Sequence, residues 1–247
     1  MSRLLPFFKR IMKNNLRSKN HELALNQCRS KNTTTFNSCL KKMEPICAST
    51  THRVIKTIRI SMELADIFMK LWPNLKIVHL IRDPRAVTRS RLRSSEFSMA
   101  RYVFTHSQDL CSRMYEDVIQ HMKLQKLYHN RLKLVIYEAL TERPMNGARD
   151  IYKFLNMTMT KQVVQWIYQT THANKKANSE YFGTSRNNAT ELVSSWRIKM
   201  DLLKVQVIDY FCKDLYTLVG FIPMNSTEQL RLLSVPSRRK SSIDGFV

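Results

Sequence analysis

Glycine is scarce in this chain. Only four of the 247 residues are glycine, and none precedes Gly147, whereas average usage of about 7% would give roughly seventeen. A Walker A loop and a dinucleotide-binding fingerprint both need glycines where backbone amides approach phosphate. The sequence before Gly147 therefore contains neither motif, and any phosphate site there must use side chains and helix ends.

Two further features are missing. No apolar run approaches the roughly eighteen residues of a membrane span, and the apolar residues near the N-terminus are interrupted by Pro6 and are too few for the apolar region of a signal peptide. The five cysteines include no C-x-x-C pair, and the sequence has no histidine pair at zinc spacing. The sequence thus predicts no membrane span within this chain and no metal site.

Positive charge is in large excess. The chain has 41 Lys and Arg against 19 Asp and Glu, a formal net charge of +22. Fixed positive charge attracts polyanions at long range, and nucleic acid, acidic lipid, sulfated glycan and nucleotide all fit this balance. A specific nucleic-acid partner is not expected, because the sequence has neither an aromatic-interleaved basic strand motif nor a recognisable DNA-reading helix.

Sequons of the form N-x-S/T occur at four positions, Asn32, Asn156, Asn188 and Asn225. Such triplets accept N-glycans in the secretory lumen, although they also arise by chance. Their number favours a secretory protein, but the chain shows no targeting segment. We therefore expect an incomplete N-terminus and contact with a membrane only through an anchor that is missing here.

The order of predicted elements indicates an α/β fold. Apolar and β-branched runs predict strands at 53–60, 76–81 and 132–137. Helical periodicity predicts helices at 61–71, 84–93, about 99–128, 144–155, 161–171 and 200–218. Strands that alternate with helices predict a central parallel sheet with crossover helices.

The most informative segment is KIVHLIRDPRAVTRSRLRS, residues 76–94. Ligands bind beyond the carboxyl ends of strands in an open parallel sheet, and this segment delivers Arg82 to that position. Asp83 and Pro84 are expected to begin a helix whose N-terminal amides face the same region. Ser90 lies two turns further on, where its hydroxyl and the Arg82 guanidinium can meet on one anion.

The same helix carries further positive charge. We expect Arg85, Arg89, Arg91 and Arg93 to strengthen the field around the anion. The alternative is that the segment is an ordinary strand followed by a solvated basic helix. Against it, a guanidinium at a strand-to-helix junction suits bidentate recognition of phosphate.

Residues 46–223 resemble the C-terminal two thirds of the catalytic domain of the Golgi carbohydrate sulfotransferases that act on the 6-hydroxyl of galactose, GlcNAc or GalNAc. The segment LKIVHLIRDPRAVTRSR is similar to the family signature that binds the 3′-phosphate of 3′-phosphoadenosine 5′-phosphosulfate. VIKTIR at 54–59, YEAL at 137–140 and TSRN followed by Trp196 and Arg197 agree in the same order. The resemblance implies a sulfotransferase fold of the P-loop NTPase type, with residues 1–45 as a poorly ordered basic arm and 224–247 as a flexible basic tail.

The resemblance also implies a role for particular residues. Arg82 and Ser90 hold the 3′-phosphate, and Lys56 lies near the oxygen that bridges phosphate and sulfate. Tyr137 lies at the edge of the adenine, and Arg186 closes on the 3′-phosphate from a C-terminal loop. From the residues alone, the alternatives are a surface strand lysine for Lys56, a core aromatic at a strand end for Tyr137 and a solvated loop charge for Arg186.

The chain departs from the family at the loop that wraps the 5′-phosphosulfate. Family members have a glycine-bearing loop of the type R-S-G-S-S-F, whereas the nearest segment here, residues 29–36, reads RSKNTTTF. It lacks the glycine and lies too close to VIKTIR, so we interpret it as a chance similarity. The fold is therefore expected to lack its N-terminal glycine loop.

Two functions follow from this sequence. The first is transfer of a sulfuryl group from 3′-phosphoadenosine 5′-phosphosulfate to a carbohydrate hydroxyl in the Golgi lumen, with Lys56 as the catalytic cation and no metal ion. No general base is identified, because Ile58 and Arg59 follow Thr57 where cytosolic relatives have a histidine. The second is a non-catalytic protein that binds nucleotide or sulfated glycan.

Overall fold

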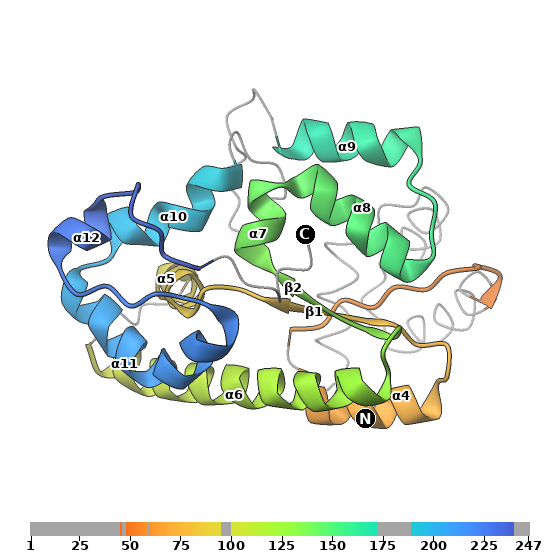
Figure 1. Ribbon diagram of the computed structural model, residues 1–247, viewed down its shortest axis with the longest axis horizontal. Helices are drawn as coiled ribbons and strands as arrows, with labels where there is room; N and C mark the ends of the chain where they lie inside the picture. Colours follow the sequence, from red (N-terminus) through yellow and green to blue (C-terminus); the bar gives the residue numbers. More distant parts are fainter. Residues whose placement is uncertain (1–44, 46–47, 59, 95–99, 172–188, 240–247) are drawn as a thin grey trace, which may run out of the picture. The chain divides into compact units, whose positions relative to one another are not determined.

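The computed structural model describes residues 45, 48–58, 60–94, 100–171 and 189–239 (Figure 1). The chain divides into two units, residues 1–58 and 59–247. The predicted sulfate-loop analogue at 29–36 lies outside the described residues.

The predicted strand at 53–60 does not form. Residues 52–57 run without strand pairing, and Val54 and Ile55 are 86% and 88% exposed. β-branched residues favour an extended backbone, but a strand also needs a partner for its backbone hydrogen bonds. No described residue pairs with this segment, so the prediction of a strand here is wrong.

A small parallel sheet lies within residues 59–247. Strand β1 (Ile77–Ile81) pairs with β2 (Leu132–Ile136), and the register sets Ile81 opposite Ile136. The connection runs through helices α5 (Pro84–Ser94) and α6 (Ala100–Leu127), as parallel strands require. Parallel strands with a helical crossover are thus confirmed, although the described residues form two strands where three were predicted.

Helices form most of the described chain. The others are α4 (Met62–Leu71), α7 (Tyr137–Glu142), α8 (Pro144–Leu155), α9 (Lys161–Thr171), α10 (Ala189–Lys199), α11 (Leu202–Val219) and α12 (Thr227–Arg231). Several begin or end with a side-chain or glycine cap: the Asp201 carboxylate accepts from the Lys204 amide, and Gly220 ends α11 at φ 82°. Helices α7, α10 and α12 were not predicted.

The main core joins α6 and α11, which lie beside one another in Figure 1. Val118 of α6 and Ile208 of α11 are fully buried, and both belong to a cluster that extends to Ile136 of β2. A disulfide links Cys111 to Cys212 across the same interface, 101 residues apart in sequence. The core therefore holds the carboxyl ends of both strands, at Ile81 and Ile136, against the two longest helices.

Part of the predicted C-terminal tail packs on this core. Phe221 and Arg238 form an antiparallel bridge, and the Arg239 amide donates to the Gly220 carbonyl at 2.7 Å. Leu230 of α12 is completely buried. Residues 224–239 are thus not the flexible tail that was expected, because α12 contributes apolar surface to the core; residues 240–247 lie outside the described part.

Candidate functional site

The carboxyl ends of the two strands bring two of the predicted site residues together. Arg82 directly follows β1 and Tyr137 directly follows β2, at the ends paired by Ile81 and Ile136. The Arg82 guanidinium carbon lies over the Tyr137 ring, 4.6 Å from its centroid. This distance is within the range of a cation–π contact.

Arg82 retains a donor that no protein group uses. The residue is half-buried, and its Nε atom is buried and has no hydrogen-bond partner among the described residues. A buried guanidinium N–H without an acceptor is costly unless a ligand supplies one. Its position at the strand end therefore suits a phosphate or sulfate oxygen.

Asp83 caps the following helix, as predicted. Its Oδ1 accepts from the Arg85 amide at 2.9 Å, and its carbonyl accepts from the Val87 amide at 3.0 Å. Ser90 lies exposed in the second turn of α5. The cap fixes the start of the helix that carries Ser90.

Arg85 does not contribute to an exposed positive field. It is completely buried, its Nε and Nη2 atoms donate to the Asp83 carboxylate, and its Nη1 atom contacts Asp209 at 3.3 Å. Its guanidinium also lies 4.2 Å from the centroid of the Trp196 ring. The prediction for Arg85 is wrong, because two carboxylates neutralise this charge inside the core.

Glu138 is a residue of this site that the sequence analysis missed. It is buried, and its Oε1 accepts from the Asp83 amide at 3.0 Å while its Oε2 has no partner among the described residues. Burial, and then the negative charge of Asp83, raise the pKa of Glu138 to about 7. Its position next to Tyr137 in YEAL was the available signal, since residue 138 must follow residue 137 to the same strand end.

Trp196 and Arg197, which follow TSRN in the sequence, have structural roles. Trp196 is buried against Arg85, as described above. Arg197 donates to backbone carbonyls of α12 and the turn that follows, at 2.6–3.0 Å, those of Gln229, Leu230, Leu232 and Val235. These bonds fix the C-terminal segment to α10.

The remaining predicted site residues are not joined to this cluster by the described geometry. Lys56 is an exposed residue of the separate unit 1–58. Arg186 lies outside the described residues. The structure therefore brings together Arg82 and Tyr137, with Glu138 and Asp83 beside them.

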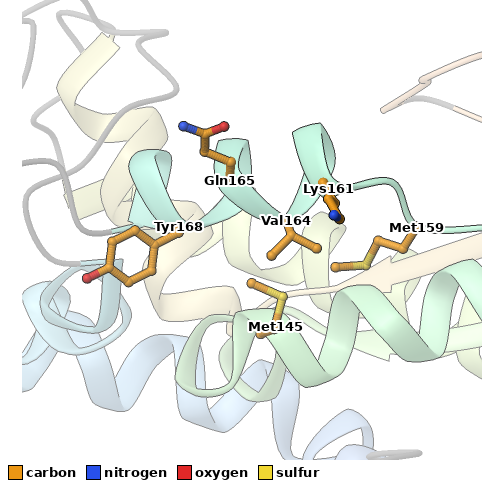
Figure 2. Close-up of a pocket in the computed structure, with 6 residues that line it drawn as sticks. All are labelled: Met145, Met159, Lys161, Val164, Gln165 and Tyr168. Atoms are coloured by element: carbon orange, nitrogen blue, oxygen red, sulfur yellow. The ribbon is translucent and has the colours of Figure 1, made fainter.

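Surface pockets lie elsewhere in the second unit. One, of about 380 Å³, is formed by α8, α9 and the loop that joins them, where the apolar side chains of Met145, Met159 and Val164 approach one another (Figure 2). Another, of about 410 Å³, includes Lys76 and Asp150. No predicted site residue lines either pocket.

The described residues form neither a metal site nor a membrane span. No group of three or more His, Cys, Asp and Glu side chains is placed there to hold a metal ion. Among the described helices, none is long and apolar enough to span a membrane.

Comparison with known proteins finds sequence relatives over most of the chain. Residues 7–161 match the sulfotransferase family, a match that begins inside the predicted N-terminal arm. The chain is 28% identical to carbohydrate sulfotransferase 1 of Danio rerio over 76% of its own length and 49% of the relative. It is 29% identical to human carbohydrate sulfotransferase 6 over 81% and 55%, and to human carbohydrate sulfotransferase 5 over 76% and 51%.

The chain thus spans about half the length of the curated relatives it matches. The family match covers more than half of the chain itself, including β1, β2 and the residues that follow each strand. Because this match extends over more than half of the chain, the chain belongs to the sulfotransferase family.

Proposed function

We propose that this chain transfers a sulfuryl group from 3′-phosphoadenosine 5′-phosphosulfate to a hydroxyl group of a glycan or glycosaminoglycan. The observation that carries the proposal is Arg82, a half-buried arginine at the carboxyl end of β1 whose Nε donor has no acceptor among the residues that the structure describes. Family membership and the similarity to carbohydrate sulfotransferases support the reaction class and the acceptor.

Each residue of the proposed site has its own role in binding the donor. Arg82 and Ser90 bind the 3′-phosphate, and Arg186 adds a charge from the C-terminal loop. Charge-assisted hydrogen bonds of this kind fix the donor for in-line transfer. The unpartnered Nε of Arg82 fits this role, because an anion oxygen satisfies it.

Transfer breaks the bond between sulfur and the bridging phosphate oxygen and forms a bond between sulfur and the sugar oxygen, whose proton passes to a base. Lys56 stabilises the negative charge that develops on the leaving phosphate oxygen. Positioning and charge neutralisation account for most of the catalysis in the parallel chemistry of phosphoryl transfer. The base is not assigned to a residue.

The direct test is transfer of labelled sulfate from 3′-phosphoadenosine 5′-phosphosulfate to a desulfated glycan. Arg82→Ala is expected to weaken retention on immobilised adenosine 3′,5′-bisphosphate at least about tenfold, since each lost charge-assisted bond contributes roughly 1.5 to 3 kcal/mol. Arg113→Ala is the matched control, because Arg113 is an exposed arginine paired with Asp109 on α6. Equal retention of Arg82→Ala and wild type contradicts the site.

Lys56→Ala separates binding from chemistry. It is expected to lower the rate of sulfate transfer far more than it lowers nucleotide retention, because its charge acts on the leaving oxygen. A Lys56→Ala protein that transfers sulfate at the wild-type rate contradicts the catalytic assignment.

A second function, binding without turnover, is favoured by one observation. Residues 1–146 contain no glycine and hence no glycine-bearing loop for the 5′-phosphosulfate. Nucleotide retention that depends on Arg82, with no sulfate transfer to any desulfated glycan offered, identifies the protein as a binder.

We also propose that the chain works in the Golgi lumen. The Cys111–Cys212 disulfide is typical of an oxidising compartment, and Asn156 and Asn225 of the sequons are exposed. Asn32 and Asn188 lie outside the described residues. Enzymatic removal of N-glycans from the protein isolated from its native cells should lower its mass; an unchanged mass argues against luminal processing.

A further inference from the structure

We propose that Tyr137 is a positioning residue: its ring holds the Arg82 guanidinium in the orientation that binds the 3′-phosphate. The resemblance instead gives Tyr137 a contact with adenine. The inference rests on the proposed function of Arg82 and adds a role for the residue beside it.

The parallel register creates this contact. Ile81 lies opposite Ile136, so the next residue of each strand, Arg82 and Tyr137, leaves the sheet at the same point. The guanidinium carbon lies 4.6 Å from the ring centroid, close enough for cation–π attraction. A long arginine side chain thereby gains a preferred position.

A second contact supports the first. It joins the next residue after Arg82 to the next residue after Tyr137. The buried Glu138 carboxylate accepts from the Asp83 amide at 3.0 Å, so the backbone after Arg82 is fixed to the backbone after Tyr137. Tyr137 and Glu138, which follow β2, therefore contact Arg82 and Asp83, which follow β1. Tyr137 acts on the side chain, and Glu138 acts on the backbone.

The contact with Tyr137 leaves Arg82 able to bind an anion. A cation–π contact uses the charge of the guanidinium and none of its N–H groups. The Nε atom, which has no partner in the described part of the chain, is one of these donors. The contact thus orients the arginine without consuming its hydrogen bonds.

A double-mutant cycle distinguishes a positioning role from a contact with adenine. Affinity for adenosine 3′,5′-bisphosphate is measured by calorimetry for the wild type, Tyr137→Leu, Arg82→Ala and the double variant. Tyr137→Leu is expected to weaken binding about three- to tenfold, in line with cation–π contacts, and to have no further effect when Arg82 is already alanine. Equal weakening in both backgrounds, or none in the wild-type background, overturns the inference.

Further substitutions of Tyr137 test the role of the ring even if Tyr137→Leu does not fold. Tyr137→Phe and Tyr137→Trp retain an aromatic face, so both are expected to bind within about twofold of wild type or tighter, since tryptophan forms the best cation–π contacts. Tyr210→Leu, on the exposed surface of α11, is the matched control and should leave the affinity unchanged. A Tyr137→Phe protein as weak as Tyr137→Leu contradicts the role of the ring.

Nuclear magnetic resonance tests the contact without any ligand. The Arg82 Nε–H signal, assigned by its loss in Arg82→Lys, is expected to be shifted upfield by the ring in wild type and Tyr137→Phe but not in Tyr137→Leu. The same signal position in all three proteins overturns the inference. Failure of the wild type to bind the nucleotide, with these shifts present, contradicts the proposed function alone.

Discussion

Arg82 and Arg85 lie on the same strand-to-helix junction, and their surroundings give them different tasks. Arg85 is completely buried between Asp83 and Asp209, so its charge is already neutralised. Arg82 is half-buried, its guanidinium lies over the Tyr137 ring, and its Nε has no acceptor in the described part of the chain. An arginine whose donors are satisfied supports the fold, whereas one with an unpaired buried N–H is available to a ligand.

Replacement of Arg85 by alanine is expected to destabilise the fold strongly. The change leaves the buried carboxylates of Asp83 and Asp209 without their cation and opens a cavity beside Trp196, which should lower the free energy of unfolding by about 3–5 kcal/mol. Urea denaturation followed by circular dichroism measures it. Arg113→Ala, which breaks an exposed pair on α6, should change stability little; similar losses in the two variants would contradict the assignment.

A histidine pair makes the stability depend on pH. His79 of β1 and His121 of α6 approach through their Nδ1 atoms at 3.3 Å. Burial, and then the charge of His121, lower the pKa of His79 to about 3, and burial lowers the pKa of His121 to about 4. Both rings are therefore neutral in the folded protein at pH values where they are protonated in the unfolded chain.

The direction of the change in stability with pH follows from the numbers of protons that the folded and unfolded states bind. Between pH 6.5 and about 4 the unfolded chain binds more protons at these histidines, so stability should fall as pH falls, by up to about 1.4 kcal/mol per pH unit for each ring. The double variant His79→Phe, His121→Phe should lose less stability than wild type over this range in urea titrations. Parallel pH profiles for the two proteins would show that the pair does not titrate in this way.

Helices α6 and α11 form the centre of the main core of the second unit. Their buried faces meet in the main core, and the disulfide between Cys111 and Cys212 joins them there. A cross-link stabilises a protein mainly by restricting the unfolded chain, and more so when it closes a long loop. The separation of 101 residues therefore makes this bond a large contributor.

Removal of the disulfide is expected to lower the free energy of unfolding by up to about 4.7 kcal/mol, the loop-entropy value for a separation near 100 residues. Cys111→Ser with Cys212→Ser, compared with wild type in thermal denaturation, measures the loss. A reducing agent should lower the melting temperature of wild type towards that of the double variant and leave the variant unaffected. Equal melting temperatures for oxidised wild type and the variant would contradict this account.

Sequence predicted the elements whose signals are local. Apolar runs located β1 and β2 to within a residue or so, and Asp83-Pro84 located the start of α5. The predicted strand at 53–60 failed because pairing depends on a partner far along the chain. Helix α12 was missed because its stability comes from buried Leu230 and the Arg197 bonds rather than from its own short sequence.

In the candidate site, too, features with a local sequence signal were predicted and features that depend on distant contacts were not. The position of Arg82 at a strand end follows from the order of strand and helix, and the structure confirms that position. The burial of Arg85 and the bond from Asp83 to Glu138 depend on segments separated by 55 to 137 residues. No local pattern specifies such contacts, so sequence reasoning gave Arg85 the wrong role and omitted Glu138.

The whole molecule carries a formal charge of +22, which attracts any anion and therefore says little about the site. Bulk attraction weakens as salt screens the charges, whereas a partly buried guanidinium is screened less. A ligand that Arg82 binds specifically differs from one attracted by the overall charge in that its affinity depends on the position of its phosphate group. The account predicts a preference for a nucleotide that carries a 3′-phosphate, retained at physiological ionic strength.

The most direct measurement compares the affinities of wild type and Arg82→Ala for adenosine 3′,5′-bisphosphate and adenosine 5′-monophosphate at about 0.15 M salt. Wild type should prefer the bisphosphate by at least about tenfold, the effect of one charge-assisted bond, and Arg82→Ala should lose most of that preference. If the two proteins discriminate between the nucleotides equally, Arg82 does not bind the 3′-phosphate.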